Sequence, residues 1–223
     1  MEAVTQPRWR RLPEARPAQI LDAALEVFAE RGLAASRLDD IARRAGVSKG
    51  TIYSYFPNKE ALFREVIRST VVSQIESGER DFESATTSAT ESLERHMRRH
   101  WAFIRSPKFA PIFRLIYAEI SQQPDLARFY GDEVVTRGHR LIASIIRRGI
   151  EQGEFREVDP SVAARMLSAP FVMHGIWCRH REAFPWMARK SDDEVLAEMI
   201  DYNLNALRSS PVPRRRKRAA SVR

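Results

Sequence analysis

The sequence contains only one cysteine, Cys178, among its 223 residues. This excludes an intramolecular disulfide bond and a metal site built from cysteines alone, and it fits a reducing compartment. No apolar run approaches the ~18 residues of a membrane span. The first residues are charged and lack an apolar core, so we expect no secretory signal. We therefore expect a cytoplasmic protein without a membrane segment.

Signatures of catalysis are also missing. The sequence has no G-x-S-x-G motif, no P-loop and no G-x-G-x-x-G motif, so we expect no catalytic residue and no cofactor. His96 and His100 have the spacing of a metal pair on a helix. No acidic residue lies between them as in a zinc protease, so we expect pocket-lining or surface histidines and no metal. Cys178 and His180, two residues apart, diverge on a helix and predict no site either.

Acidic side chains are missing from the C-terminal end. The formal net charge is +8, and the last ten residues, RRRKRAASVR, contain six basic side chains and no acidic one. Residues 67–213 are neutral overall. A basic tail suits contact with a polyanion, and a solvated disordered end is the alternative.

Helical periodicity is present in nearly every segment, with apolar residues at i, i+3, i+4 and i+7. The stretch STVVSQI (69–75) is β-branched and fits a strand by propensity, but we interpret it as the continuation of a helix. No segment shows convincing strand alternation. We predict an all-α fold of about nine helices.

The stretch AGVSKGTIYSYF (45–56) places unusual residues inside this helical pattern. Gly46 tolerates the positive φ of a tight turn between two helices, and Ser48 can cap the second helix. Val47 and Ile52 are expected to point inward. The remaining outer face is polar or aromatic, which is typical of the recognition helix of a helix-turn-helix. A plain αα-hairpin fits the same pattern, whereas a protein–protein adaptor would carry an apolar surface at residues 49–55.

The stretches ILDAALEVFAERG, DDIARRAGVSKGTIYSYF and PNKEALF resemble the N-terminal domain of the TetR family of bacterial transcriptional repressors. The close match covers residues 17–66, and the rest of the chain resembles the family in its helical layout. The resemblance implies a three-helix helix-turn-helix domain joined by a long helix to an α-helical effector and dimerisation domain. The domains expected from it are a flexible arm (1–16), the DNA-binding domain (17–66), the ligand-binding and dimerisation domain (67–208) and a basic disordered tail (209–223).

The same resemblance implies a role for individual residues. Lys49 and Gly50 fall where the family approaches base edges, and Tyr53 falls where an aromatic ring packs on bases. Arg37 replaces the usual Ser or Thr that opens the second helix, so that cap is lost unless Ser36 takes it. The expected DNA-binding set is Arg37, Ser48, Lys49, Gly50, Thr51, Tyr53, Ser54, Tyr55 and Lys59, of which Thr51, Ser54, Tyr55 and Lys59 would hold phosphates.

The second half of the chain is rich in aromatic residues and methionine, and ordinary core is the alternative for most of them. The resemblance implies a pocket for a bulky apolar ligand. The expected lining is Trp101, Phe113, Tyr117, Met173, His174 and Trp177. It also implies that two long helices, about 160–182 and 192–208, form a dimer interface.

We therefore expect a homodimeric repressor that binds a pseudo-palindromic DNA operator and is released by a small apolar or aromatic effector. An activator role is the alternative within the same family. An enzyme and an adaptor that does not bind DNA are the alternatives from other classes.

Overall fold

The computed structural model describes residues 16–180 and 182–209. The predicted arm lies outside the described residues except for Arg16, and so does the basic tail after Ser209. The described chain is helical, and its only strand-like feature is an isolated bridge between Phe155 and Arg208. The all-α prediction is confirmed.

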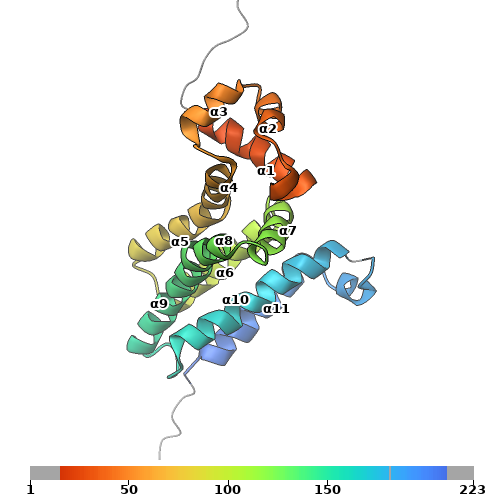
Figure 1. The fold of residues 1–223 in the computed structure, drawn as a ribbon. Helices are drawn as coiled ribbons and strands as arrows, with labels where there is room; N and C mark the ends of the chain where they lie inside the picture. Colours follow the sequence, from red (N-terminus) through yellow and green to blue (C-terminus); the bar gives the residue numbers. More distant parts are fainter. Residues whose placement is uncertain (1–15, 181, 210–223) are drawn as a thin grey trace, which may run out of the picture. The chain divides into compact units, whose positions relative to one another are not determined.

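The first helices contain the motif singled out in the sequence (Figure 1). Helix α1 continues to Ala35 although Gly32, at φ 76°, has a non-helical backbone. The β-branched stretch 69–75 is helical and begins within a π-helical segment, so its helical interpretation is confirmed. The helices of this part are α1 (Arg16–Ala35), α2 (Leu38–Ala45), α3 (Lys49–Tyr55), α4 (Lys59–Ile67), the π-helical η2 (Arg68–Val72) and α5 (Ser73–Glu83).

The remaining helices follow the predicted stripes. A second π-helical segment joins α8 to α9, so residues 124–151 form one continuous helical segment. The helix expected over 160–182 ends earlier, at Trp177, and is followed by two short 3-10 turns. These elements are α6 (Ala89–Arg105), α7 (Phe109–Ile120), α8 (Pro124–Tyr130), η3 (Gly131–Thr136), α9 (Arg137–Glu151), α10 (Pro160–Trp177), η4 (Cys178–His180), η5 (Pro185–Arg189) and α11 (Asp192–Leu207).

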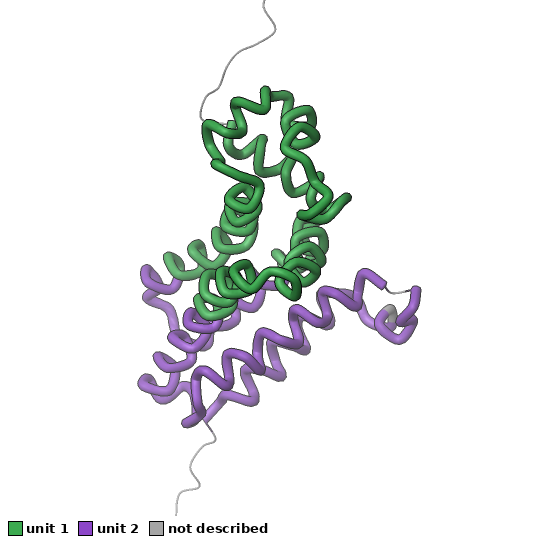
Figure 2. The backbone as a smooth tube through the Cα atoms, viewed as in Figure 1, with its two compact units in different colours: residues 1–81, 102–138 green, residues 82–101, 139–223 purple. Residues whose placement is uncertain are grey.

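The chain divides into two compact units (Figure 2). Unit 1 consists of residues 1–81 and 102–138, and unit 2 consists of residues 82–101 and 139–223. Helices α7 and α8 therefore pack with α1 to α4, although they follow them by many residues in sequence. The functional division at residue 66 stays a prediction.

The core of unit 1 joins the N-terminal helices to α7 and α8. Phe28 of α1 meets the ring of Phe63 of α4 edge to face, with centroids 5.5 Å apart, and both side chains are fully buried. Ile112, Leu115 and Ile116 of α7 belong to the same cluster. Since each buried aliphatic side chain contributes ~1.5–3 kcal/mol, this cluster fixes the N-terminal helices on α7.

In unit 2, the carboxylate of Glu154, which follows α9, caps the first turn of α6. Glu154 accepts hydrogen bonds from the backbone N–H groups of Ala89 and Thr90, at 2.9 Å each. Helix α11 begins with a capping box formed by Ser191 and Glu194. None of the described helices has both the length and the apolar content needed to cross a lipid bilayer.

Candidate nucleic-acid interface

The turn between α2 and α3 has the geometry that the sequence predicts. Gly46 has φ 65°, and its N–H group bonds to the carbonyl groups of Ala42 and Arg43. The hydroxyl of Ser48 accepts a hydrogen bond from the N–H group of Thr51 at 3.1 Å, which caps α3. A side chain with a Cβ would be strained at the φ of Gly46, so the tight turn depends on glycine.

Helix α3 has one buried side and one exposed side. Ile52 is fully buried, and Phe56, at the end of the helix, is buried too. Tyr53 is 50% exposed and Tyr55 is 44% exposed, and Lys49 next to the cap is also exposed. These large exposed side chains on a short capped helix are available to a partner.

The hydroxyl groups of α3 make local contacts. Thr51 Oγ1 lies 2.8 Å from Ser48 Oγ, and Ser54 Oγ donates a hydrogen bond to the carbonyl of Thr51 at 2.7 Å. Both Ser48 and Ser54 remain exposed. Their hydroxyl oxygens keep acceptor capacity, and rotation of the hydroxyl group is sufficient to redirect its proton.

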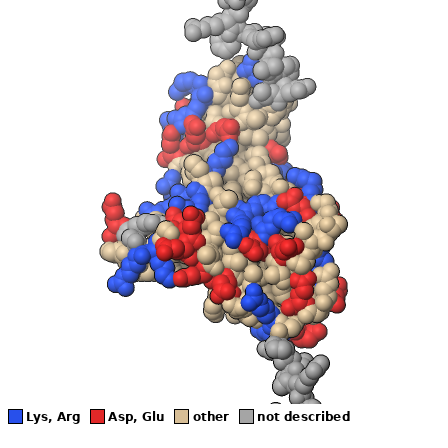
Figure 3. Space-filling view, turned by 180° about the vertical axis from the view of Figure 1, so that it is seen from behind, with Lys and Arg blue, Asp and Glu red and all other residues tan. Residues whose placement is uncertain are grey.

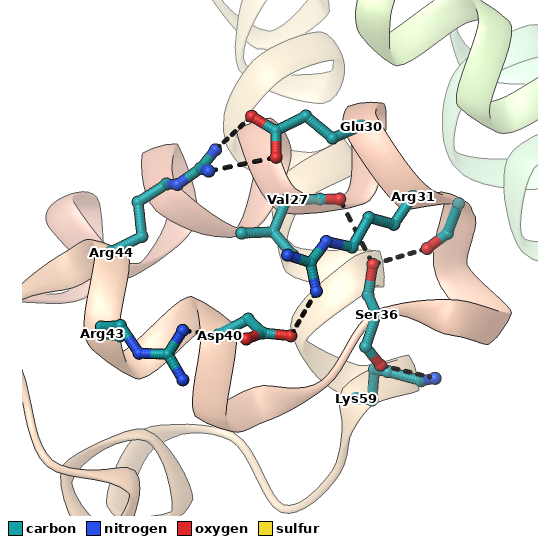
Figure 4. A network of polar contacts seen from close by, with 9 residues as sticks. Val27, Glu30, Arg31, Ser36, Asp40, Arg43, Arg44 and Lys59 are labelled. Atoms are coloured by element: carbon teal, nitrogen blue, oxygen red, sulfur yellow. Dashed lines mark hydrogen bonds and ion pairs between the residues drawn. The ribbon is translucent and has the colours of Figure 1, made fainter.

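Ion pairs join α1 to α2 (Figure 4). Asp40 of α2 accepts hydrogen bonds from Arg31 of α1, at 2.6 Å, and from Arg43, at 3.3 Å. Arg44 binds both carboxylate oxygens of Glu30, and this hydrogen bonding lowers the pKa of Glu30. On the face of the molecule shown in Figure 3, basic and acidic side chains likewise lie next to one another rather than in separate fields.

Lys49 is part of the same charge pattern. Its ammonium nitrogen lies 3.0 Å from Oδ2 of Asp39 in the first turn of α2. Both side chains are about half exposed, so the pair contributes at most ~1 kcal/mol to stability. The pair nevertheless keeps the lysine beside the start of α3.

The beginning of α2 differs from one sequence-based expectation. Arg37 occupies the N-cap position and makes no side-chain cap. The hydroxyl of Ser36 donates to the carbonyl groups of Gly32, at 2.5 Å, and Val27, at 3.3 Å, and so it does not cap α2. The alternative cap by Ser36 is therefore wrong, because this hydroxyl closes the end of α1 instead.

Lys59 at the start of α4 is bonded within the protein. Its ammonium group donates to the carbonyl oxygens of Ala34, at 2.9 Å, and Ser36, at 3.1 Å (Figure 4). The side chain is only partly exposed. Its expected phosphate contact stays a prediction, and the structure adds a second role at the end of α1.

The expected pocket residues are divided between the two compact units. In unit 2, the ring of Trp101 stacks on His174 at 5.1 Å between centroids, and Trp177 instead faces Trp186 at 6.3 Å. Met173 is exposed on the same helix as His174. In unit 1, Phe113 and Tyr117 of α7 have centroids 4.2 Å apart, and Tyr117 is 53% exposed.

His96 and His100 lie on α6, shortly before Trp101. The rings of His96 and His100 are stacked at 6.0 Å, and His100 lies 6.0 Å from the ring of Phe171. Burial lowers the pKa of His96 to about 3, with the charge of His100 adding to the effect, and lowers the pKa of His100 to about 4. Both side chains are therefore neutral at physiological pH.

Helices α10 and α11 expose an apolar groove that the sequence analysis did not define by residue. The groove has a volume of about 940 Å³ and includes Met166, Pro170, Met199 and Tyr202. Met166 is 71% exposed and Tyr202 is 76% exposed. The signal was present, because large apolar side chains recur on the outer sides of both helices.

Glu119 of α7 is a second residue that sequence reasoning missed. It is 9% exposed, and its carboxylate accepts hydrogen bonds from the N–H group of Leu33, at 3.0 Å, and from Gln123, at 2.9 Å. Its position in the sequence could have indicated that it is buried, since Glu119 continues the apolar stripe of Ile112 and Leu115 by one further turn.

Two family models match successive parts of the chain. Residues 20–66 match a family model described as bacterial regulatory proteins, tetR family. Residues 84–199 match a model described as tetracyclin repressor-like, C-terminal domain. The first match contains the whole α2–turn–α3 motif.

Individual relatives agree with the family models. The fatty acid metabolism regulator protein of Bacillus subtilis is 32% identical over 150 residues, which are 67% of this chain and 76% of that protein. The transcriptional repressor KstR2 of Rhodococcus jostii is 28% identical over 154 residues, or 68% of this chain and 74% of that protein. The structure of the regulator FadR from Bacillus subtilis in complex with stearoyl-CoA has a TM-score of 0.68 at 24% identity, covering 85% of this chain and 98% of that chain, so the two share a fold.

Proposed function

Because the chain belongs to the tetR family of bacterial regulatory proteins, we propose that it is a homodimeric repressor released from its operator by a small apolar effector. Its membership makes it a DNA-binding transcriptional regulator. The observation that carries the finer proposal is the exposed side of α3, where Lys49, Tyr53 and Tyr55 surround a helix fixed by the buried Ile52. A short capped helix with such a face fits the major groove of DNA.

Direct reading of bases falls to the exposed side chains of α3. Lys49 can donate to guanine O6 and N7, and the ring of Tyr53 can pack on a thymine methyl group. The absence of a side chain at Gly50 allows the backbone to approach the groove. Arg37, Ser48, Thr51, Ser54 and Tyr55 supply phosphate contacts, which set the register of the helix without reading sequence.

The dimer forms through α10 and α11. The groove leaves the large apolar side chains of Met166 and Tyr202 exposed, and a twofold mate would cover them. Two subunits present two copies of α3. The operator is then a pseudo-palindrome with half-sites about 34–36 Å apart, one turn of the double helix.

The effector has a long or bulky apolar part. Aromatic side chains on α6, α7 and α10 support this, as do the names of two proteins similar to this chain, which concern fatty acid metabolism and a stearoyl-CoA complex. Repression is supported by the similarity to KstR2. Activation is the alternative, and it predicts a transcription level that falls when the protein is removed.

The decisive experiment is to sequence DNA fragments retained by the purified protein. We expect an inverted repeat upstream of a regulated gene, and release of that fragment by stearoyl-CoA or a free fatty acid. Retention of random fragments without an enriched repeat would contradict the proposal. Transcription of the adjacent gene with and without the protein then separates repression from activation.

A further inference from the structure

Helix α7 presents two different sides within unit 1. One side packs in the core shared with α1, through Ile112, Leu115 and Ile116. Another side carries the adjacent, tilted rings of Phe113 and Tyr117, of which Tyr117 is about half exposed. A single rigid helix therefore connects an accessible aromatic surface to α1.

Glu119 ends the side of α7 that faces α1. Its Oε1 accepts a hydrogen bond from the N–H group of Leu33 at 3.0 Å, and its Oε2 accepts one from Nε2 of Gln123 at 2.9 Å. Among the described residues it is the one buried carboxylate side chain. The contact with Leu33 links two helices that are 86 positions apart in sequence.

A carboxylate at this place is costly. Burial of a polar group is unfavourable unless hydrogen bonds replace its contacts with water. Glu119 also lies in the last turn of α7 (Phe109–Ile120), the end of a helix that favours basic rather than acidic side chains. An apolar residue would extend the stripe of α7 at lower cost, so the stability of α7 does not explain Glu119.

Leu33 lies near the end of α1 (Arg16–Ala35), and we call residues 32–37, from Gly32 to the start of α2, the α1–α2 junction. The junction begins at the non-helical Gly32, which explains why the N–H group of Leu33 is paired outside α1. Ser36 donates back to the carbonyl of Gly32, and Lys59 of α4 donates to the carbonyl groups of Ala34 and Ser36. Side chains from α4 and α7 therefore fix the junction from outside.

The position of the recognition motif depends on this junction. Helix α2 begins at Leu38, directly after it, and α2 carries Asp39, the ion-pair partner of Lys49. A change at Leu33 thus reaches the DNA-facing helix through a short, hydrogen-bonded stretch of chain.

We infer that Glu119 is a positioning residue for DNA binding, which transmits a displacement of α7 to the α1–α2 junction. The inference rests on the proposed function. A ligand against Phe113 and Tyr117 rotates or shifts α7, removes the carboxylate from Leu33, and releases the junction from the geometry that places α3 for the groove. With Glu119 in place, the junction is held in that geometry.

The test uses two variants of nearly equal shape in the full chain. Glu119→Met keeps the volume and removes the acceptor, whereas Glu119→Gln keeps an oxygen that can accept from Leu33. Leu115→Ala is the control, because it weakens the packing of the same helix and leaves the hydrogen bond from Leu33 to Glu119 in place. Operator affinity and amide hydrogen exchange of residues 33–37 are measured well below the unfolding temperature.

We expect Glu119→Met to weaken operator binding roughly tenfold and to raise exchange at residues 33–37. Glu119→Gln should recover most of both, and Leu115→Ala should lower the unfolding temperature while leaving affinity within about twofold. Wild-type affinity in Glu119→Met, or an equal loss in Leu115→Ala, would overturn the inference. Failure of the wild-type protein to bind any operator is a different outcome, which rejects the proposed function itself.

Discussion

The ammonium nitrogen of Lys49 lies 3.0 Å from Oδ2 of Asp39, so the first residue of α3 is ion-paired to the first turn of α2. A phosphate or a guanine edge competes with this carboxylate for the same ammonium group. Asp39 therefore acts against indiscriminate contact between Lys49 and DNA, because its carboxylate partly neutralises the ammonium group.

Asp39→Asn should raise affinity for random DNA several-fold, since it weakens a pair of up to ~1 kcal/mol and frees Lys49 for phosphates. Operator affinity should rise less, so the ratio of specific to non-specific binding falls. Fluorescence anisotropy with both DNAs at several salt concentrations measures this ratio. Asp125→Asn, on α8, makes the same change in net charge outside the motif, and an equal effect from it would reduce the result to net charge alone.

Lys59→Met should lower the free energy of unfolding by roughly 1–3 kcal/mol, because it leaves the carbonyl oxygens of Ala34 and Ser36 without their charged donor. Urea denaturation measures the loss. Because the family resemblance also gives Lys59 a phosphate contact, the slope of log affinity against log salt for random DNA should fall by about one. Unchanged stability would contradict the structural role, and an unchanged slope would contradict the phosphate contact.

Acid should destabilise unit 2 through its buried histidines. Burial holds the pKa of His96 near 3 and that of His100 near 4, whereas an unfolded histidine titrates near 6.5. Below pH 6.5 the unfolded chain binds protons that the folded chain does not, so stability falls as pH decreases. Between pH 7 and pH 5 each histidine removes roughly 2 kcal/mol.

Urea titrations at pH 7 and pH 5 test this dependence. In the double variant His96→Gln, His100→Gln, the free energy of unfolding should fall much less between pH 7 and pH 5 than in wild type. Its stability at pH 7 will be lower than that of wild type. If wild type and variant lose equal stability on acidification, the histidines are not its cause.

Two glycines of the α8–η3–α9 segment make a matched pair. A Cβ on Gly149 would lie 2.2 Å from the ring of Phe155, whereas a Cβ on Gly131 would meet nothing within 4 Å. Gly149→Ala should therefore cost ~1–3 kcal/mol of unfolding free energy. Gly131→Ala, at a helical φ of −58°, should be neutral or add up to ~1 kcal/mol. Equal effects of the two substitutions would mean that Phe155 relaxes freely.

Local features of the fold were predictable because their causes lie close together in sequence. Gly46, Ser48 and Asn58 act within four residues of their partners, and Gly46 and Ser48 have the predicted turn and cap. The helical stripes were predictable for the same reason. Where α10 ends was not, since Trp177 and the turns after it carry no strong stop signal.

Features that depend on distant contacts were not predictable. The hydroxyl of Ser36 had two possible partners, and the position of α1 decided for the carbonyl groups of Gly32 and Val27. The partner of Glu119 lies 86 residues away, so its role could not be derived from local pattern. The pocket residues also remain a prediction, because periodicity cannot distinguish a ligand-facing aromatic ring from a core one.

The most direct test of the account compares Lys49→Ala and Tyr53→Ala with Arg98→Ala, which removes an exposed basic side chain of α6 outside the proposed DNA and dimer surfaces. Binding is measured on the retained operator fragment and on random DNA of equal length, at one salt concentration. We predict a loss of ~1–3 kcal/mol on the operator for each α3 variant, a much smaller loss on random DNA, and relaxed preference at one base position. Equal losses on both DNAs, or no loss on the operator, would contradict the claim that the exposed side of α3 reads the sequence.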